Sequence, residues 1–119
     1  MPHTIQDKAF VDYVVELMQT IGPVNAKSMF GGHGIFLDGL MFGLIAQSIL
    51  YLKIDKALED ELKARGLAAF TYNRKGKEFK MSYYQAPEEA LENEEDMKLW
   101  AGKAYNAALQ TVKKKPKKK

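Results

Sequence analysis

The chain has 119 residues, the usual length of one domain, and 46% of them are hydrophobic, which suffices for a core without disulfides or metal. It contains no cysteine, which excludes disulfides, thiolate nucleophiles and thiolate metal ligands. The net charge of +3 is unevenly placed, because six of the 18 basic residues lie within residues 113–119 and the first 112 residues carry 12 basic against 15 acidic side chains.

This charge distribution predicts a mildly acidic folded domain over residues 1–112 and a disordered Lys-rich tail over residues 113–119. The N-terminus has no charged segment followed by an apolar run, so we expect no secretory signal. No stretch approaches the ~18 apolar residues of a membrane span. We therefore expect a cytoplasmic, bacterial-type protein that does not interact with a membrane.

A first helix is predicted to begin after Thr4, since Asp7 three residues on resembles a capping box. It should end at Gly22 and Pro23, because glycine accepts the terminal backbone angle and proline cannot continue the hydrogen-bond ladder. Apolar residues recur within this segment at helical spacing, at Phe10, Val14, Leu17 and Ile21.

Residues 27–53 have the pattern of strands. Asp38 and Gly39 separate two apolar runs and favour the positive φ angles of a tight hairpin turn, and a second reversal is predicted near Gln47 and Ser48. Nearly every residue from 35 to 52 is apolar, so these strands should be covered on both faces, by helices or by a second subunit. We therefore expect a homodimer.

Asp55 is predicted to cap a second helix that runs through Arg65 and stops at Gly66. A second hairpin follows, with its turn at residues 73–76. In the strand after that turn apolar and polar residues alternate, so one face of residues 78–84 should be solvated.

Asn93 is predicted to cap a final helix, and the six carboxylates within residues 88–96 suit its positive N-terminal end. The apolar stripe of this helix should consist of Met97, Trp100, Ala101, Ala104 and Ala108. The fold class is therefore α+β: an antiparallel sheet of about five strands with three helices, in the order α-β-β-β-α-β-β-α.

The candidate catalytic and ligand-binding groups are few. The cluster Gly31, Gly32, His33 and Gly34 precedes a strand rather than a helix, so it lacks the helix N-terminus of a phosphate loop and is interpreted as a bend or bulge where backbones approach closely. His3 and His33 are the only imidazoles, too few for a metal centre without cysteine. No serine has the surroundings of a nucleophile. We expect no enzyme, metal or cofactor, and a small-ligand site around His33 is the weaker alternative.

Basic residues form a second candidate site, for nucleic acid. Lysines and an arginine near the second hairpin, together with interleaved tyrosines, suit a sheet that binds nucleic acid, and an unfolded polycation gains affinity for any polyanion by counterion release. An ordinary solubilising surface is the alternative explanation. The candidate contacts are Arg74, Lys75, Lys77, Lys113, Lys114, Lys115, Lys117, Lys118 and Lys119.

The chain contains a "Met-Phe-Gly-Gly" segment, a following hairpin and a "Met-Ser-Tyr-Tyr" segment. At this separation, and over about residues 10–110, these segments resemble the N-terminal domain of the TfoX (Sxy) family, bacterial regulators of competence for DNA uptake. The family motif residues, expected to be structural or to form an interface, are Met29, Phe30, Gly31, Gly32, Gly34, Asp38, Gly39, Met81, Tyr83 and Tyr84.

The resemblance implies a non-enzymatic domain that regulates transcription through contacts with other proteins. Full-length family members have a separate helical C-terminal domain, so this chain is expected to be a stand-alone N-terminal domain. Family members are thought to act with the cyclic-AMP receptor protein at promoters, which implies a partner in the transcription machinery or a regulator. Non-specific DNA contact through the tail is expected to assist, and direct binding of nucleic acid is the alternative function.

Overall fold

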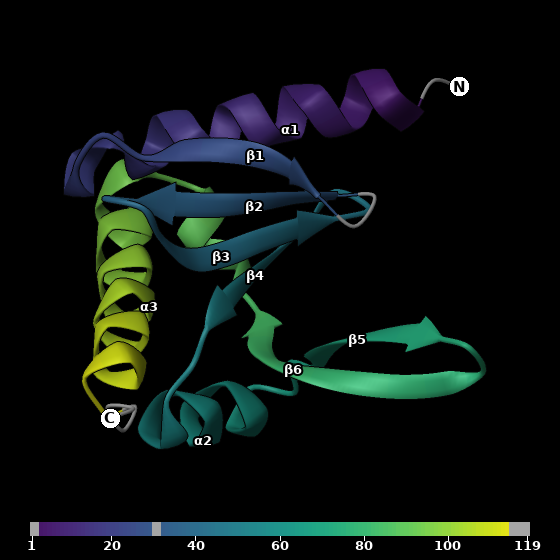
Figure 1. Cartoon of the computed structure of the whole chain (residues 1–119). Helices are drawn as coiled ribbons and strands as arrows, with labels where there is room; N and C mark the ends of the chain where they lie inside the picture. The colour runs from purple at the N-terminus through teal and green to yellow at the C-terminus, as the bar shows by residue number, and fades with distance from the viewer. Residues whose placement is uncertain (1–2, 30–31, 115–119) are drawn as a thin grey trace.

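The computed structural model describes the backbone of residues 3–29 and 32–114, and the side chains of residues 8–29, 32–71, 75–78 and 81–112. Figure 1 shows a sheet with helices on one side and a projecting hairpin. The helices are α1 (His3–Met18), α2 (Lys56–Ala64) and α3 (Glu94–Lys114), with two 3-10 turns, η1 (Gln19–Ile21) and η2 (Glu88–Leu91). The strands are β1 (Asn25–Met29), β2 (Gly32–Leu37), β3 (Leu40–Ala46), β4 (Ile49–Lys53), β5 (Ala69–Arg74) and β6 (Lys77–Gln85).

The predicted α+β class and element order are confirmed, with one strand more than the five expected. The six strands form one sheet in the order β1-β2-β3-β4-β6-β5, and every neighbouring pair is antiparallel. The added strand is β1, which precedes the glycine cluster. Its side chains are mostly exposed, so it has no apolar pattern of its own and is a strand because its backbone pairs with β2.

The predicted hairpin turns are confirmed by their backbone angles. Each turn has two central residues, both at positive φ, as a primed turn requires. The pairs are Asp38 (54°) with Gly39 (79°), Gln47 (54°) with Ser48 (62°), and Lys75 (53°) with Gly76 (80°).

The predicted start of α1 was wrong. Thr4 lies inside the helix, which already includes His3, so it is not the capping residue. Threonine is only weakly disfavoured inside a helix, so the helix can extend past it toward the N-terminus. The predicted end is confirmed, since α1 passes through η1 and Gly22 closes it at a φ of 142°.

The caps of the other two helices are confirmed. The Asp55 carboxylate accepts a hydrogen bond from the Leu58 backbone N–H at 2.8 Å, and the Asn93 side-chain oxygen accepts one from the Asp96 N–H at 2.8 Å. At the end of α2, Gly66 has a φ of 81° and the Leu67 N–H donates to the Leu62 carbonyl at 3.1 Å, which is the Schellman arrangement.

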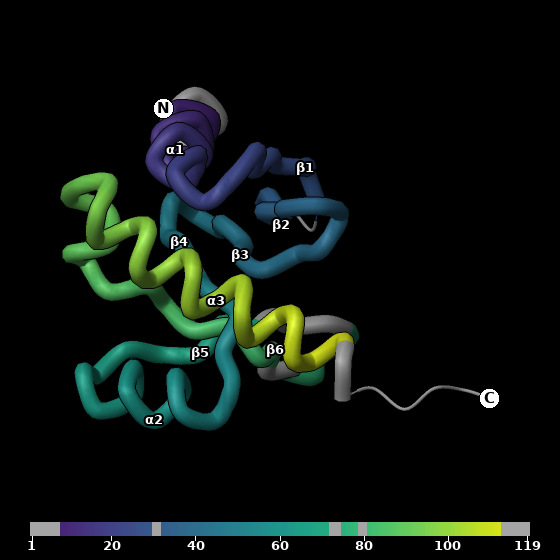
Figure 2. Tube along the Cα trace, turned by 90° about the vertical axis from the view of Figure 1, so that its left-hand side faces the viewer, coloured from purple at the N-terminus to yellow at the C-terminus, as the bar shows by residue number. Residues whose placement is uncertain are grey.

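The main core lies between one face of the sheet and the helices α1 and α3. Figure 2 shows α1 along one edge of the strands and α3 crossing β3 and β4. Every residue of the predicted α3 stripe is buried, with at most 2% of its surface exposed. Phe42 packs edge-on against Tyr105 with ring centroids 5.6 Å apart, which joins β3 to α3. No helix in the described part of the chain has the length and apolarity of a membrane span.

Candidate protein-binding surface

The sheet has a second face that α1 and α3 do not cover, here called the open face. Residues paired across antiparallel strands point to the same side. One row of such pairs runs through Ala26, Ile35, Gly43, Leu52 and Tyr84, and its large side chains belong to the main core. The adjacent row must therefore lie on the open face.

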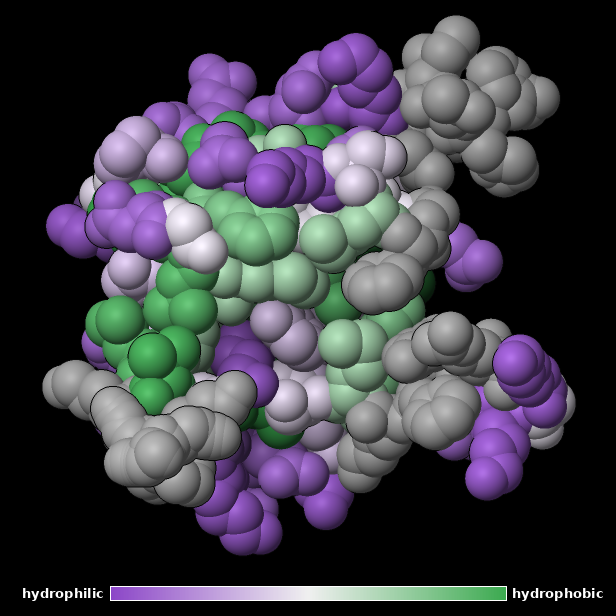
Figure 3. Space-filling model, in the orientation of Figure 1, coloured by the Kyte–Doolittle hydropathy of each residue, from purple (hydrophilic) through white to green (hydrophobic). Residues whose placement is uncertain are grey.

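That adjacent row runs through Lys27, Gly34, Leu44, Tyr51 and Gln85. Leu44 and Tyr83 have only 4% and 7% of their surfaces exposed, yet neither belongs to the main core cluster. They mark a second, smaller apolar layer on the open face. Figure 3 shows apolar residues gathered over the middle strands on this side of the molecule. We call this layer the open-face cluster; it consists of Met29, Phe36, Met41, Leu44, Tyr51, Phe70 and Tyr83.

Gly34 holds the centre of the open-face cluster. A Cβ at this position would lie 2.8 Å from Met29 Sδ, 2.9 Å from Phe36 Cε1 and 3.3 Å from Met41 Sδ. The two methionines and the phenylalanine therefore converge over the place that a side chain at Gly34 would fill. Methionine side chains are flexible and polarisable and adapt to the shape of a bound partner.

The rest of the open-face cluster is joined by aromatic contacts. The rings of Tyr51 and Phe70 meet edge to face with centroids 5.0 Å apart, and the Tyr83 hydroxyl donates to the Met41 carbonyl at 3.4 Å. A hollow lined in part by Met29 and Phe70 has a volume of about 10 Å³. That volume suits no more than one water molecule, so this hollow is not itself a ligand pocket.

Two lysines stand over aromatic rings of this surface. Lys27 Nζ lies 5.4 Å from the ring centroid of Phe36, and Lys53 Nζ lies 5.4 Å from that of Tyr83. Lys53 Nζ also donates to the Ser82 hydroxyl at 2.7 Å. Burial lowers the pKa of Lys53 and raises the pKa of Tyr83 to about 12. The surface is therefore apolar with a cationic rim.

The structure brings together four of the ten predicted motif residues. Met29, Gly32, Gly34 and Tyr83 come from three strands and lie on the open face, and Met81 lies in β6 where its pairing with β5 is irregular. The other described motif residues are elsewhere: Asp38 and Gly39 form a turn, and Tyr84 lies on the opposite face, where its hydroxyl donates to Glu59 at 3.1 Å. Phe30 and Gly31 lie outside the described residues.

The sequence interpretation missed the larger members of the open-face cluster. Phe36, Met41, Tyr51 and Phe70 are half-buried and were hidden within continuous apolar runs. For Phe36 and Met41, the signal that identifies them is the hairpin register counted outward from the turn at Asp38. Alternation alone fails there, because a bulge at Ile35 and Phe36 shifts the pairing of β2 with β3.

The predicted close approach of backbones is confirmed at Gly32, whereas Gly34 meets side chains and Gly31 lies outside the described residues. A Cβ on Gly32 would lie 2.2 Å from the Ile45 carbonyl oxygen, so only glycine fits there. His33 is half-buried and pairs in register with Ser28 and Ile45. Among the described residues, no group of three or more His, Cys, Asp or Glu side chains is placed to bind a metal ion.

The predicted nucleic-acid contacts are only partly within the described structure. Lys75 and Lys77 are exposed at the tip of the β5–β6 hairpin, and Arg74 is paired with Lys77 in register. The backbone of α3 continues through Lys113 and Lys114, two residues beyond the expected end of the domain. The other tail positions, Lys115, Lys117, Lys118 and Lys119, lie outside the described residues.

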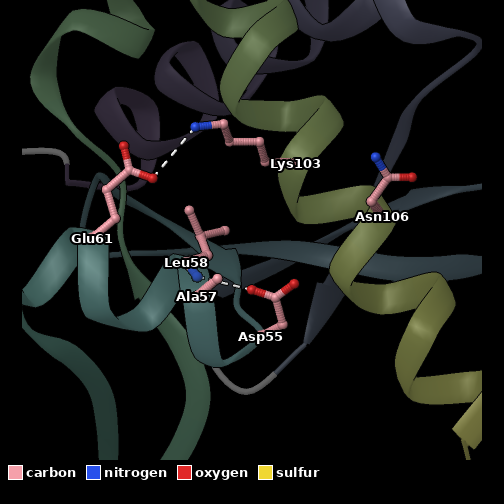
Figure 4. A pocket seen from close by; sticks show the side chains of 6 residues that line it. All are labelled: Asp55, Ala57, Leu58, Glu61, Lys103 and Asn106. Atoms are coloured by element: carbon pink, nitrogen blue, oxygen red, sulfur yellow. Dashed lines mark hydrogen bonds and ion pairs between the residues drawn. The ribbon is translucent and has the colours of Figure 1, made fainter.

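A cleft of about 290 Å³ lies between α2 and α3 (Figure 4). Its charged groups have structural partners: Asp55 caps α2, and Lys103 Nζ pairs with Glu61 at 3.4 Å. Lys103 and Arg65 also stand over the ring of the buried Trp100, at 4.4 and 5.0 Å from its centroid. The charged side chains at this cleft therefore serve to join the two helices.

Salt bridges beside this cleft extend the joint to η2. The Arg65 guanidinium donates to Glu89 at 3.0 Å and holds the pKa of that carboxylate below its ordinary value. The Trp100 Nε1–H points toward Glu89 and adds to the lowering, but it is too poorly placed to count as a hydrogen bond. These groups stabilise the fold and are not candidates for a binding site.

Comparison with known proteins finds a matching protein family. The sequence model described as "TfoX N-terminal domain" matches residues 16–108. The chain is 35% identical over 78 residues to the DNA transformation protein TfoX of Haemophilus influenzae. That alignment covers 64% of this chain and 36% of the relative, so the chain corresponds to about a third of the relative's length.

Proposed function

The chain belongs to the TfoX N-terminal domain family, and on that premise we propose that it is a non-enzymatic regulatory domain that binds another protein. The partner belongs to the transcription machinery or is a regulator of it, and the process is DNA transformation, which the name of the relative supports. The protein acts in the cytoplasm.

One observation carries this proposal: the open-face cluster is apolar, most of its members are half-buried, and the described helices do not cover it. Aromatic and methionine side chains are enriched at the centres of protein interfaces. The Phe36 ring is half-buried on this face and does not belong to the main core packed by the helices. The family motif residues Met29, Gly34 and Tyr83 support it.

Direct binding of nucleic acid is the alternative function. The exposed Lys75 and Lys77 favour it, because they lie together at the tip of a projecting hairpin (Figure 1). A homodimer that buries the open-face cluster also stays a prediction. Both alternatives are tested below.

The proposed function is tested in the native host with the substitution Phe36→Gln. Wild type and variant are each returned to a strain that lacks the gene, and the transcripts of DNA-uptake genes and the frequency of transformation are measured. We expect Phe36→Gln to abolish complementation. Leu99→Gln is the matched control, because Leu99 is 52% exposed on α3, away from the cluster. Full complementation by Phe36→Gln at wild-type protein level would contradict the proposal.

A further inference from the structure

Carboxylates are nearly absent from the sheet, whereas basic residues occur on both the sheet and the helices. The six strands contain a single carboxylate, Glu78. By contrast, the strands contain five basic residues, Lys27, Lys53, Arg74, Lys77 and Lys80. Carboxylates gather instead on the helical elements, at Glu59, Asp60, Glu61, Glu88, Glu89, Glu94, Glu95 and Asp96.

Lys27 and Lys53 stand over two rings of the open-face cluster, and the strands β1 to β4, which form most of this face, contain no carboxylate. Lys53 is half-buried, and its amine contacts the neutral Ser82 hydroxyl and the Tyr83 ring. A carboxylate brought to this amine would find a partly desolvated cation, where a charge pair is stronger than at a fully exposed site.

We propose that the open face binds an acidic protein segment that inserts apolar side chains between Lys27 and Lys53. This inference rests on the proposed function and names the chemistry of its partner. The apolar side chains cover Phe36 and Met41, and carboxylates beside them pair with the two lysines. The cationic rim gives the surface a preference for acidic over basic segments.

The same geometry disfavours two other occupants. A second copy docked face to face would bring four lysines of like charge into one interface, two from each copy, with no carboxylate to pair with them. Single-stranded nucleic acid needs flat aromatic faces for stacking. Here Lys27 and Lys53 already lie over the rings of Phe36 and Tyr83, and Tyr51 meets Phe70 edge to face.

The test is a titration of the full-length, isotope-labelled chain, followed by backbone amide NMR shifts. Three probes are used: a synthetic amphipathic peptide of leucine and glutamate, the same peptide with lysine for glutamate, and oligothymidylate. We expect the acidic peptide to shift amides of β2, β3 and β4 around Met41 and Tyr51, and the basic peptide to leave them unchanged. The position of the shifts separates this binding from attraction to the Lys-rich tail.

Charge reversal then tests the two lysines. The double variant Lys27→Glu, Lys53→Glu should bind the acidic peptide roughly tenfold more weakly, which corresponds to the loss of two partly exposed charge pairs, and should now accept the basic peptide. The control double variant Lys8→Glu, Lys98→Glu makes the same change of net charge at exposed helix positions and should bind like wild type.

Four outcomes would overturn the inference. The basic peptide could shift open-face amides as much as the acidic peptide does, or oligothymidylate could bind the open face more tightly than the acidic peptide. The control double variant could weaken binding of the acidic peptide as much as the Lys27→Glu, Lys53→Glu variant does, or no probe could shift open-face amides at all. A face-to-face dimer of the unliganded chain, seen as broadened amides of β2 and β3, would overturn it too. Failure of this inference about an acidic partner is distinguishable from failure of the proposed function. If Phe36→Gln still abolishes complementation, the surface binds a partner of other chemistry.

Discussion

Gly32→Ala is expected to destabilise the protein strongly although the residue is only half-buried. A Cβ there would lie 2.2 Å from the Ile45 carbonyl oxygen, whereas ordinary contacts are 3.4–4 Å, so the atoms must separate by more than 1 Å. Ile45 is held in register on both sides, by His33 and by Leu50. Overpacking costs about 1–3 kcal/mol, and the stiffer unfolded chain returns about 0.4–1 kcal/mol. We expect the free energy of unfolding to fall by about 2 kcal/mol in total, because the obstacle is a backbone atom and the overpacking cost therefore lies near the upper end of its range.

The assay is urea denaturation followed by circular dichroism, in which this loss lowers the midpoint by about 1 M. Gly102→Ala is the matched control, because Gly102 lies within α3 and a Cβ there would meet nothing within 4 Å. That variant should gain about 0.5–1 kcal/mol from helix propensity. A Gly32→Ala midpoint equal to that of wild type would refute the close-approach explanation of the glycine cluster.

Three further predictions concern other parts of the molecule. Burial raises the pKa of Tyr83 from the ordinary 10.0 to about 12, so the stability that its neutral hydroxyl contributes is complete below pH 10 and is lost as the pH rises toward 12. In denaturation curves measured over that pH interval, the Tyr83→Phe variant should therefore lose less free energy of unfolding than wild type. Deleting residues 113–119 should remove most binding to duplex DNA, measured by fluorescence anisotropy, and the wild-type affinity should fall steeply with salt; equal binding by the truncated chain would favour the hairpin lysines instead. His33→Ala should leave both the denaturation midpoint and partner binding nearly unchanged, and loss of a partner by this folded variant would make the glycine bend a functional site.

Local chemistry made much of this fold predictable. The turn at Asp38 and Gly39 and the caps at Asp55 and Asn93 follow from residues that satisfy backbone angles or free N–H groups on their own. Such features depend on neighbours in sequence. They were therefore visible without any knowledge of tertiary contacts.

Features set by distant contacts were not predictable in this way. β1 is a strand because its backbone pairs with β2. The expected solvated face of β6 does not extend to Tyr84, which is only 3% exposed. The candidate surface depends on register. The bulge in the β2–β3 pairing leaves Phe42 unpaired, and Phe42 therefore lies with Gly43 on the core side. The same bulge places Met41 opposite Phe36 on the open face.

The central claim is that the open-face cluster binds a protein. The most direct measurement is quantitative affinity purification from native cytosol, with wild type, Phe36→Gln and Leu99→Gln as baits. The account predicts that one set of proteins is retained by wild type and Leu99→Gln and reduced roughly thirtyfold with Phe36→Gln, as expected for loss of an aromatic interface residue worth about 2 kcal/mol. Equal retention by all three folded baits would contradict the claim.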